Sequence, residues 1–307
     1  MKILNEVILL TVIIPLMLLT GCKKEYQPPE CNYIIYFPDT AFKNALLDIM
    51  IEEGDDYRRL DENRDGEICD GEAKRVKELY LYNKGISDLT GIQEFSNLKI
   101  LDCDRNSFDT LALQLNSLQD LNCNNNSITH LDVSNLPNLR SLSCIGNKLQ
   151  EIDISKNINL KSLSCLYNEL NSIDVSKNKQ LEYISIKYNN ISFIDLSNQI
   201  YLQQLSINNN NISTLDLSNN VELSTISIME NPISQINLSN NLKLVQFVFG
   251  NNNLERLDIS KNINLTTLVN GGDFNLSEIC VWTLPFPPES GYYYIEGIPN
   301  SAFVICD

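Results

Sequence analysis

Histidine is almost missing from this sequence: His130 is the only one in 307 residues. Because histidine is the side chain that titrates near neutral pH, catalysis by histidine and a histidine-rich metal centre are not expected. The chain also lacks a glycine-rich phosphate loop, a nucleophile motif and a base to pair with a nucleophile. These absences predict a protein that is not an enzyme.

Positive charge is scarce as well. Lysine and arginine number 23 against 39 aspartate and glutamate residues, which gives a formal net charge of -16. Such a chain repels phosphate groups, so neither a nucleic-acid partner nor contact with an anionic membrane face is expected. Hydrophobic residues make up 43% of the chain, enough for a sizeable core, which argues against wholesale disorder.

Only one long apolar run is present, from Val7 to Leu19, and it follows the positive charge of Lys2. Its 13 residues are too few for a transmembrane helix and suit a signal peptide. The run ends in the tetrapeptide LTGC at 19–22. A signal peptide over residues 1–21 is therefore predicted.

The LTGC tetrapeptide resembles the lipobox of bacterial lipoproteins. The resemblance implies cleavage before Cys22 and acylation of this cysteine, palmitate included, and several acyl chains anchor a protein stably. Lys23 stands where aspartate marks inner-membrane retention, which implies an outer-membrane lipoprotein, either periplasmic or surface-exposed. The alternative is an ordinary signal peptide that happens to reach a cysteine. Residues 22–36, which include Pro28-Pro29, would form a lipidated tether.

Residues 76–275 repeat one pattern ten times, at intervals of 22, 20 and then 21 residues seven times. A representative unit is LKSLSCLYNELNSIDVSKNKQ at 160–180. The pattern resembles the leucine-rich repeat, L-x-x-L-x-L-x-x-N-x-L. The units start at Val76, Leu98, Leu118, Leu139, Leu160, Leu181, Leu202, Leu223, Leu244 and Leu265.

Each unit is expected to form one coil of a leucine-rich-repeat solenoid. Leu163 and Cys165 would point inward from a short strand, while Ser162 and Ser164 point outward. The strands would stack into a parallel β-sheet on the concave face. The second half of each unit alternates apolar and polar residues, as in Ile173-Asp-Val-Ser, which predicts an extended back wall with little helix.

Three columns of identical residues recur at the repeat interval. The asparagines at the ninth position are interpreted as a buried ladder that satisfies backbone groups at the turns. The aspartates are expected to accept backbone hydrogen bonds, with a cation-binding stripe as the alternative. The cysteines occupy a core position, so free buried thiols are expected. The columns are Asn106, Asn126, Asn147, Asn168, Asn189, Asn210, Asn231 and Asn252; Asp132, Asp153, Asp174, Asp195, Asp216 and Asp258; and Cys103, Cys123, Cys144 and Cys165.

A solenoid must be covered at both ends. An N-terminal cap is predicted over 37–75, with a small helix capped by Asp39 or Thr40. The apolar face of this helix would comprise Phe42, Ala45, Leu46, Ile49 and Met50. A C-terminal cap over 276–307 is expected to be closed by a Cys280–Cys306 disulfide. A bridge between Cys31 and Cys69 is a weaker expectation.

The stretch DENRDGEICDGE at 61–72 matches the EF-hand calcium loop D-x-N-x-D-G-x5-E. Its oxygen ligands for a structural Ca²⁺ would be Asp61, Asn63, Asp65, the carbonyl of Glu67, and Glu72. The arrangement resembles the helix and calcium loop that cap internalin-like repeats in bacterial surface proteins. A single loop favours a structural clamp; a vestigial loop and a regulatory switch are the alternatives.

The strand face of such a solenoid is an extended binding surface. Aromatic anchors are typical of interfaces, and Leu166, Tyr167, Tyr183, Lys187 and Tyr188 are predicted to cluster on two adjacent coils. The sequence thus predicts a non-enzymatic binding or adhesion module for a protein or glycan ligand. The alternatives are scattered surface aromatics without function, and a structural component that packs on another envelope protein.

Overall fold

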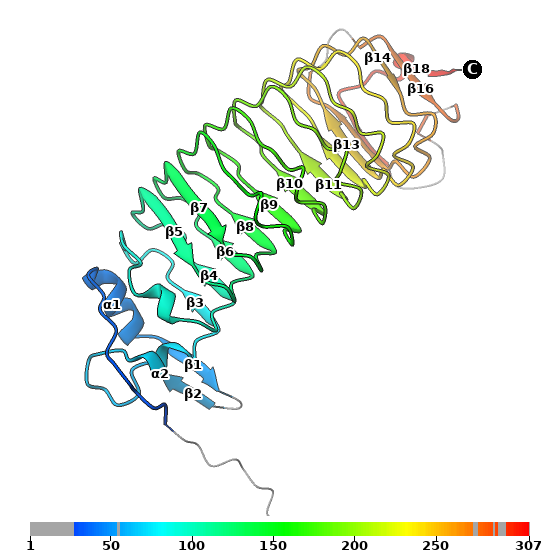
Figure 1. The fold of residues 1–307 in the computed structure, drawn as a ribbon. Coiled ribbons are helices and arrows are strands. Elements are labelled where there is room, and N and C mark those ends of the chain that lie inside the picture. The colour runs from blue at the N-terminus through cyan, green and yellow to red at the C-terminus, as the bar shows by residue number, and fades with distance from the viewer. Residues whose placement is uncertain (1–27, 54–55, 273–275, 285, 288–292, 307) are drawn as a thin grey trace, which may run out of the picture.

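A computed structural model describes residues 28–53, 56–272, 276–284, 286–287 and 293–306. They form a gently bent parallel β-solenoid with a small cap at its N-terminal end (Figure 1). The predicted signal peptide, Cys22 and the first part of the tether lie outside these residues. Within the described part, no helix is long and apolar enough to cross a membrane.

The concave face is one sheet of eleven parallel strands, and each coil contributes one. The inward leucines are in register: Leu163 lies opposite Leu142 on one side and Ile184 on the other. At ~4.8 Å per strand the sheet is about 48 Å long. Its strands are β3 (Glu78–Tyr80), β4 (Ile100–Asp102), β6 (Asp120–Asn122), β8 (Ser141–Ser143), β9 (Ser162–Ser164), β10 (Tyr183–Ser185), β11 (Gln204–Ser206), β12 (Thr225–Ser227), β13 (Gln246–Phe249), β15 (Thr267–Asn270) and β17 (Tyr294–Glu296).

The back wall is extended, as predicted, and little of it is hydrogen-bonded into sheets. Parallel strands occur near its two ends, and the described coils between them run extended without a ladder. Side chains from both walls, such as Leu163 and Val175, fill the space between them. The back-wall strands are β5 (Thr110–Gln114), β7 (His130–Asn135), β14 (Arg256–Asp258), β16 (Glu278–Val281) and β18 (Phe303–Ile305); the 3-10 turns are η1 (Ile92–Glu94) and η2 (Asn300–Ala302).

The asparagine column has the predicted structural role. The Asn189 side chain donates from Nδ2 to the carbonyl oxygens of Cys165 (2.9 Å) and Ile186 (3.0 Å). Its Oδ1 accepts the N–H of Leu170 at 3.0 Å. Cys165 and Leu170 belong to the preceding coil, so one buried amide satisfies the turn of its own coil and joins it to the preceding one.

A second amide column lies at the other corner of the coil, where the back wall returns to the strands. Asn178 is fully buried, and its Nδ2 donates to the carbonyl oxygens of Ile154 and Asn157, each at 2.9 Å. The alternating pattern predicts an extended wall here and does not indicate that these residues are buried. The column consists of Asn157, Asn178, Gln199, Asn220, Asn241 and Asn262.

The four core cysteines are free and buried, as predicted. Cys144 Sγ and Cys165 Sγ lie 3.1 Å apart in adjacent coils. Burial raises the pKa of the Cys103 and Cys123 thiols well above the ordinary value. Because the thiolate is the reactive form, these residues act as small core side chains.

The aspartate column makes the predicted local hydrogen bonds. Asp174 Oδ1 accepts the N–H of Ser176 at 2.8 Å, and this bond holds the pKa of Asp174 below its ordinary value. Asn237 accepts the same bond from Ser239 at 3.0 Å, so the turn needs an acceptor and not a charge.

The N-terminal cap begins with α1 (Thr40–Leu47), where Asp39 accepts the N–H of Phe42 at 3.0 Å as the predicted cap. Phe42, Ala45 and Leu46 are buried, as expected. The predicted extension of the helix face through Ile49 and Met50 is wrong.

Instead of continuing the helix, the chain forms an antiparallel hairpin of β1 (Met50–Glu53) and β2 (Asp56–Arg59). Met50 is exposed, whereas Ile51 is buried, as alternation along a strand requires. A short apolar run such as Ile49 to Ile51 fits a helix or a strand equally well by periodicity alone.

The C-terminal cap contains the predicted disulfide between Cys280 and Cys306. Cys280 lies in β16 and Cys306 directly follows β18, its parallel neighbour. The sequence did not reveal that this segment completes an eleventh coil: β17 extends the concave sheet and β18 extends the back wall. The disulfide therefore joins the last two turns of the back wall.

We predict that Asn189→Ala destabilises the solenoid by about 2 kcal/mol, because it leaves buried carbonyl and N–H groups unsatisfied. Urea unfolding followed by circular dichroism measures the change. Asn190→Ala is the matched control, since Asn190 is exposed. Equal losses in the two variants would show that the buried amide column is not what holds the coils together.

Candidate functional site

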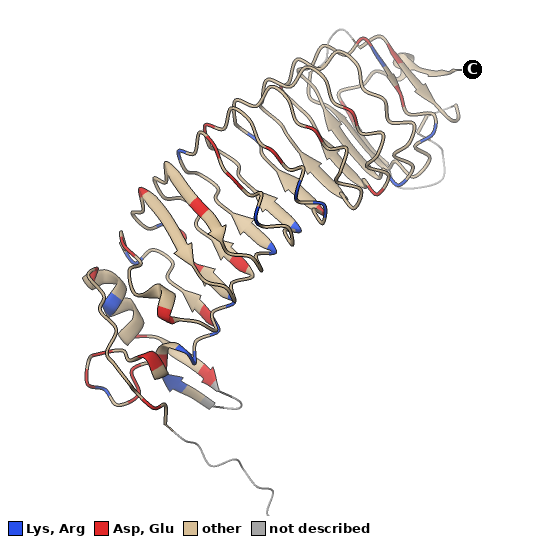
Figure 2. Ribbon diagram, viewed as in Figure 1, with Lys and Arg blue, Asp and Glu red and all other residues tan. Residues whose placement is uncertain are grey.

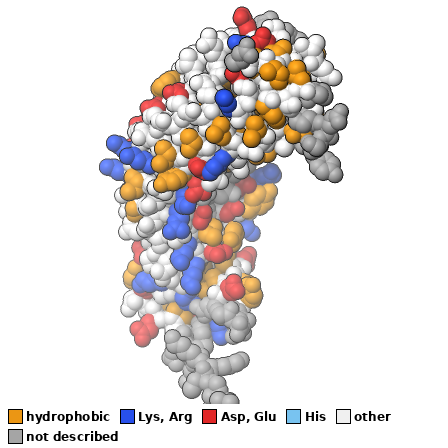
Figure 3. All heavy atoms as spheres, turned by 90° about the vertical axis from the view of Figure 1, so that its right-hand side faces the viewer, with side chains coloured by type: hydrophobic (Ala, Val, Ile, Leu, Met, Phe, Trp, Pro, Cys, Tyr) orange, Lys and Arg blue, Asp and Glu red, His pale blue; other side chains and the backbone are white. Residues whose placement is uncertain are grey.

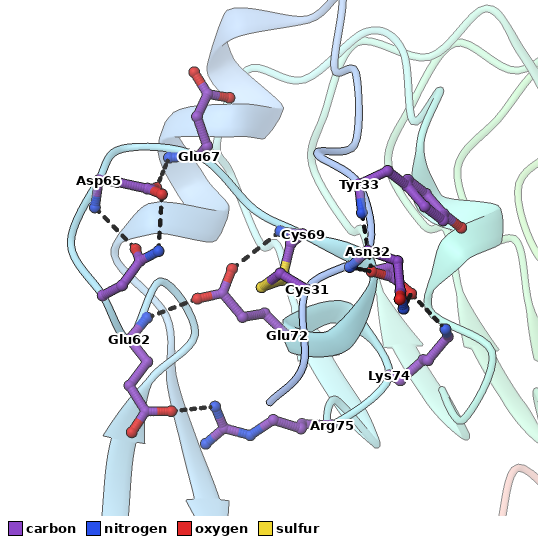
Figure 4. The surroundings of a disulfide bond; sticks show 12 residues. Cys31, Asn32, Tyr33, Glu62, Asp65, Glu67, Cys69, Glu72, Lys74 and Arg75 are labelled. Carbon is purple, nitrogen blue, oxygen red and sulfur yellow. Dashed lines mark hydrogen bonds and ion pairs between the residues drawn. A yellow bond between two sulfur atoms is a disulfide. The ribbon is translucent and has the colours of Figure 1, made fainter. Parts of the chain in front are cut away.

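The loop at 61–72 is held against the tether by a disulfide between Cys31 and Cys69 (Figure 4). Backbone bonds reinforce the contact, since Ile35 N–H donates to the Ile68 carbonyl at 2.8 Å. Gly71 permits the close approach, because a Cβ there would lie 2.2 Å from the Glu30 carbonyl oxygen. The weaker of the two disulfide expectations is thus present in the structure.

Asp70 provides an anchor that the loop motif did not reveal. This buried carboxylate accepts hydrogen bonds from the Asn32 backbone N–H (2.8 Å) and Nδ2 (3.0 Å). The Lys74 ammonium lies 2.7 Å away, and together these contacts hold the pKa of Asp70 well below its usual range. Figure 4 shows Asn32, Tyr33 and Lys74 gathered beside the disulfide.

The first half of the loop folds as the motif requires. Asp61 Oδ2 accepts the N–H of Gly66 at 3.1 Å, and Gly66 adopts a left-handed φ of 81°. Asn63 Oδ1 accepts the N–H of Asp65 (3.0 Å), and Asp65 Oδ1 accepts that of Glu67 (2.9 Å). Each side chain therefore stabilises the turn that follows it.

The last ligand position, Glu72, is buried in α2 (Asp70–Ala73). Its two carboxylate oxygens accept the N–H groups of Glu62 and Cys69, each at 3.0 Å. Asp61 is also buried, and its Oδ1 has no hydrogen-bond partner. A buried carboxylate oxygen without a partner is costly, and a cation would remove that cost.

The donors at this loop are all oxygens, which suits calcium. They do not form a closed cage: the described clusters of acidic and cysteine side chains within 4.8 Å of one another lie at the two disulfides. The Glu67 side chain pairs with Lys43 of α1 at 2.7 Å, and the contribution predicted for Glu67 is its backbone carbonyl. The residues fit calcium in donor type and in order along the chain.

On the concave face, in-register stacking brings Tyr167 and Tyr188 together. Their rings lie parallel, with centroids 4.3 Å apart and an interplanar angle of 11°. Leu166 and Lys187 immediately precede them, half-buried, on the same two coils. Tyr183 begins β10, five residues before Tyr188 and up to about 16 Å away along an extended chain. The predicted cluster is therefore a stacked pair of Tyr167 and Tyr188, and Tyr183 lies apart from them at the start of β10.

Both tyrosines occupy left-handed backbone positions, with φ of 52° and 55°. The same position in the other coils carries mostly asparagine or glycine, which tolerate a positive φ. A bulky residue with a positive φ destabilises the fold by about 1 kcal/mol. Tyr167 is 53% exposed and Tyr188 43%. The neighbouring Tyr188 hydroxyl raises the pKa of the Tyr167 hydroxyl. The two strained, exposed rings thus form one stacked aromatic pair, and exposed aromatic side chains are common ligand anchors.

The polar ladder on this face is interrupted beside the tyrosines. Ser143 Oγ donates to Asn124 Oδ1 of the preceding coil, and Ser227 Oγ donates to Asn208 Oδ1, each at 2.8 Å. At Ser185 the preceding coil carries Leu166 instead, and Ser185 Oγ is buried without a partner. Ile145 and Leu166 thus interrupt the ladder on two successive coils.

An apolar edge, not predicted from the sequence, lies two residues before the first leucine of several units. Its side chains are 44–62% exposed and repeat every 21 residues or a multiple of 21. Figure 3 shows hydrophobic side chains interspersed with lysine and arginine along one side of the solenoid. The sequence does contain a signal for this edge: an apolar residue directly follows the buried amide and stands two positions before the first leucine of the next unit. The edge consists of Ile158, Ile200, Val221, Leu242 and Ile263.

No protein-family model and no curated protein sequence matches the chain. Solved structures match. The functional domain of InlJ from Listeria monocytogenes, which includes a cysteine ladder, is 25% identical with a TM-score of 0.52, over 75% of this chain and 65% of that one. A leucine-rich-repeat protein of Leptospira interrogans is 25% identical with a TM-score of 0.56, over 67% and 63%.

Internalin C2 from Listeria monocytogenes is 22% identical with a TM-score of 0.55, over 80% of this chain and 94% of that one. The chain thus spans just under two thirds of the first two structures and most of the third. Together with the eleven-stranded sheet, these similarities define the fold as a leucine-rich-repeat solenoid.

Proposed function

We propose that this protein is a non-enzymatic binding module that holds a protein ligand on its concave face. The observation that carries this proposal is the stacked Tyr167–Tyr188 pair: two exposed rings kept in a strained conformation on an otherwise small and polar surface. Desolvated aromatic anchors of this kind dominate the energy of protein interfaces. Similarity to leucine-rich-repeat solenoids such as the functional domain of InlJ supports the same function.

We further propose that the module is an outer-membrane lipoprotein attached through Cys22. The LTGC tetrapeptide supports this attachment. Residues 28–34, the part of the predicted tether that the structure describes, lead onto the N-terminal cap (Figure 1). Fatty-acid labelling in cells should be lost in Cys22→Ser and kept in Cys103→Ser, whose thiol is buried. Equal labelling of both variants would contradict lipidation at Cys22.

The loop at 61–72 is proposed to bind a structural Ca²⁺ through Asp61, Asn63, Asp65, the Glu67 carbonyl and Glu72. The unpartnered buried Oδ1 of Asp61 is the observation that favours an ion. The ion would neutralise the carboxylates that come together at the junction of loop, tether and first coil.

A second candidate function follows from the apolar edge of Ile158, Ile200, Val221, Leu242 and Ile263. Exposed apolar residues in a row favour packing against another envelope protein. This structural role uses a different surface from ligand binding, so variants of the two surfaces separate the two functions.

Tyr167→Ala with Tyr188→Ala is predicted to weaken binding of a captured ligand at least tenfold, because the pair supplies the central anchor. Binding is measured against panels of immobilised extracellular proteins and glycans, with circular dichroism to verify the fold. Tyr57→Ala, an exposed tyrosine of the cap hairpin, is the control. If Val221→Lys abolishes capture and the double variant does not, the apolar edge is the functional surface.

Calcium is predicted to raise the melting temperature, and a chelator to reverse the rise. A ligand at a hundredfold excess over its Kd stabilises the native state by about 2.7 kcal/mol. Asp61→Asn and Glu72→Gln should each abolish the shift, whereas Glu52→Gln, an exposed residue of β1, should preserve it. A melting temperature indifferent to calcium would identify the loop as vestigial.

A further inference from the structure

A groove of about 980 Å³ lies on the back wall, on the side of the solenoid that faces away from the concave sheet. It spans the three coils that start at Leu181, Leu202 and Leu223. Its volume falls within the range of ligand sites in proteins, about 300–1,000 Å³. The groove shares no residue with the tyrosine pair, the loop at 61–72 or the apolar edge.

The groove follows from the sizes of the side chains in one column of the repeats. Phe193 and Gln235 occupy equivalent positions two coils apart, and the coil between them carries the smaller Thr214 there. The residue before this position is a serine in all three coils, as at Ser213 and Ser234. Small side chains between two larger ones leave a hollow whose ends are roughly 10 Å apart at the coil spacing.

One end of the groove and its floor are apolar. Phe193 is 62% exposed and lines the groove at its first coil. Leu215 and Ile236 also line it, and neighbouring side chains cover most of both, so they form its floor. An exposed phenyl ring beside an apolar floor offers contact to the C–H face of a ring-shaped ligand.

The aspartate column forms the polar side of the groove. Asp195 Oδ1 accepts the N–H of Ser197 and Asp216 Oδ1 that of Ser218, each at 2.9 Å. These bonds hold the pKa of both carboxyls below the ordinary value, so both are ionised at neutral pH. An ionised carboxylate has about four acceptor positions, so its bond to the turn leaves others for a ligand.

Asn237 adds a donor to this row of acceptors. The turn needs only an acceptor, and Asn237 Oδ1 supplies it to the N–H of Ser239 at 3.0 Å. The Nδ2 of the same amide is a donor that this bond does not use. The column therefore presents acceptors on two coils of the groove and a donor on the third, beside serine and threonine hydroxyls that can do both.

The charge of the groove and of the whole chain opposes anionic ligands. No lysine or arginine is among the described residues that line the groove. Figure 2 shows Asp and Glu positions along the whole length of the solenoid. Phosphate and uronate groups would therefore be repelled. A cationic group is attracted to the two carboxylates, but it only donates hydrogen bonds and has no acceptor for the Asn237 amide.

We propose that the back-wall groove binds a neutral oligosaccharide. Sugar hydroxyls both donate and accept hydrogen bonds, which matches the row of carboxylates and amide. The apolar C–H face of a sugar ring packs on Phe193 and on the floor of the groove. A hexose in an extended glycan is about as long as the ~4.8 Å coil spacing, so successive sugars meet successive coils. The site is separate from the concave face, and it does not depend on the function proposed for that face.

The test is a glycan array that displays cellohexaose, maltohexaose, mannohexaose and other neutral hexasaccharides beside uronate and phosphorylated ones. The full chain should bind at least one neutral hexasaccharide, and should bind no anionic one more tightly. Phe193→Ala should weaken this binding about tenfold, because it removes the ring on which the sugar packs. Tyr57→Ala removes an exposed ring of the cap hairpin and is the control, which should bind as the unmodified chain does.

Asn237→Asp tests the amide without disturbing the turn. The neighbouring coil uses Asp216 for the same turn, so the variant keeps the fold and loses only the Nδ2 donor. Affinity for the neutral hexasaccharide should fall about threefold, the effect of one hydrogen bond. The matched control is Asp174→Asn, in the same column outside the groove, and it should leave the affinity unchanged.

Absence of binding to every neutral hexasaccharide on the array would overturn the proposal. Tighter binding of a hexalysine peptide than of any neutral glycan would do so as well, because the groove would then take a cationic segment. Unchanged glycan affinity in Phe193→Ala or in Asn237→Asp, with the fold verified by circular dichroism, would place the glycan elsewhere on the molecule and reject the groove.

Discussion

Side-chain amides at both corners of the six coils that start at Leu139 to Leu244 are the constraint on which the rest of this molecule depends; the two coils before them carry Leu115 and Leu136 at the second corner. A coil that reverses direction within a few residues leaves backbone groups that the strand ladders cannot reach. Asn189 at one corner and Asn178 at the other supply donors to those groups, and both reach carbonyls of the coil before. Each coil is thereby held in register with its neighbour as well as closed on itself.

Because the coils stack in register, residues separated by one repeat length come into contact. Residues 21 apart in the sequence lie on adjacent coils, so every column in the alignment of repeats becomes a row on the surface or in the core. The cysteine column, the aspartate turns, the apolar edge and the Tyr167–Tyr188 stack all arise in this way. The same register that stabilises the fold also sets the spacing of any ligand groups that dock on it.

The two ends are stabilised by other contacts, because an end coil has no neighbouring coil on one side. At the C-terminal end an irregular eleventh coil is tied to the tenth by Cys280–Cys306. At the N-terminal end the cap is linked to the first coil by Asp39, which accepts the backbone N–H groups of Ser87 (2.8 Å) and Asp88 (3.0 Å). The Cys31–Cys69 disulfide thus joins the tether to the cap, and Asp39 joins the cap to the first coil.

The sequence by itself determined the solenoid, the number of regular coils, the direction of each inward side chain and the Cys280–Cys306 pair. It could do so because ten repetitions average out local ambiguity, and because inward and outward positions alternate with a fixed period. Where no repetition exists, as at Ile49 to Ile51, a short apolar run did not distinguish a helix from the hairpin that forms.

Only the tertiary structure decided which of the face residues meet. Tyr183 and Tyr188 belong to the same strand and turn, yet Tyr188 contacts Tyr167, because neighbouring coils bring equivalent positions closer than a short extended segment brings its own ends. It also revealed that Asn178 and its equivalents are buried, since a polar residue of an extended segment is covered only when neighbouring coils stack on it. That stacking joins different repeats, so no single repeat determines it.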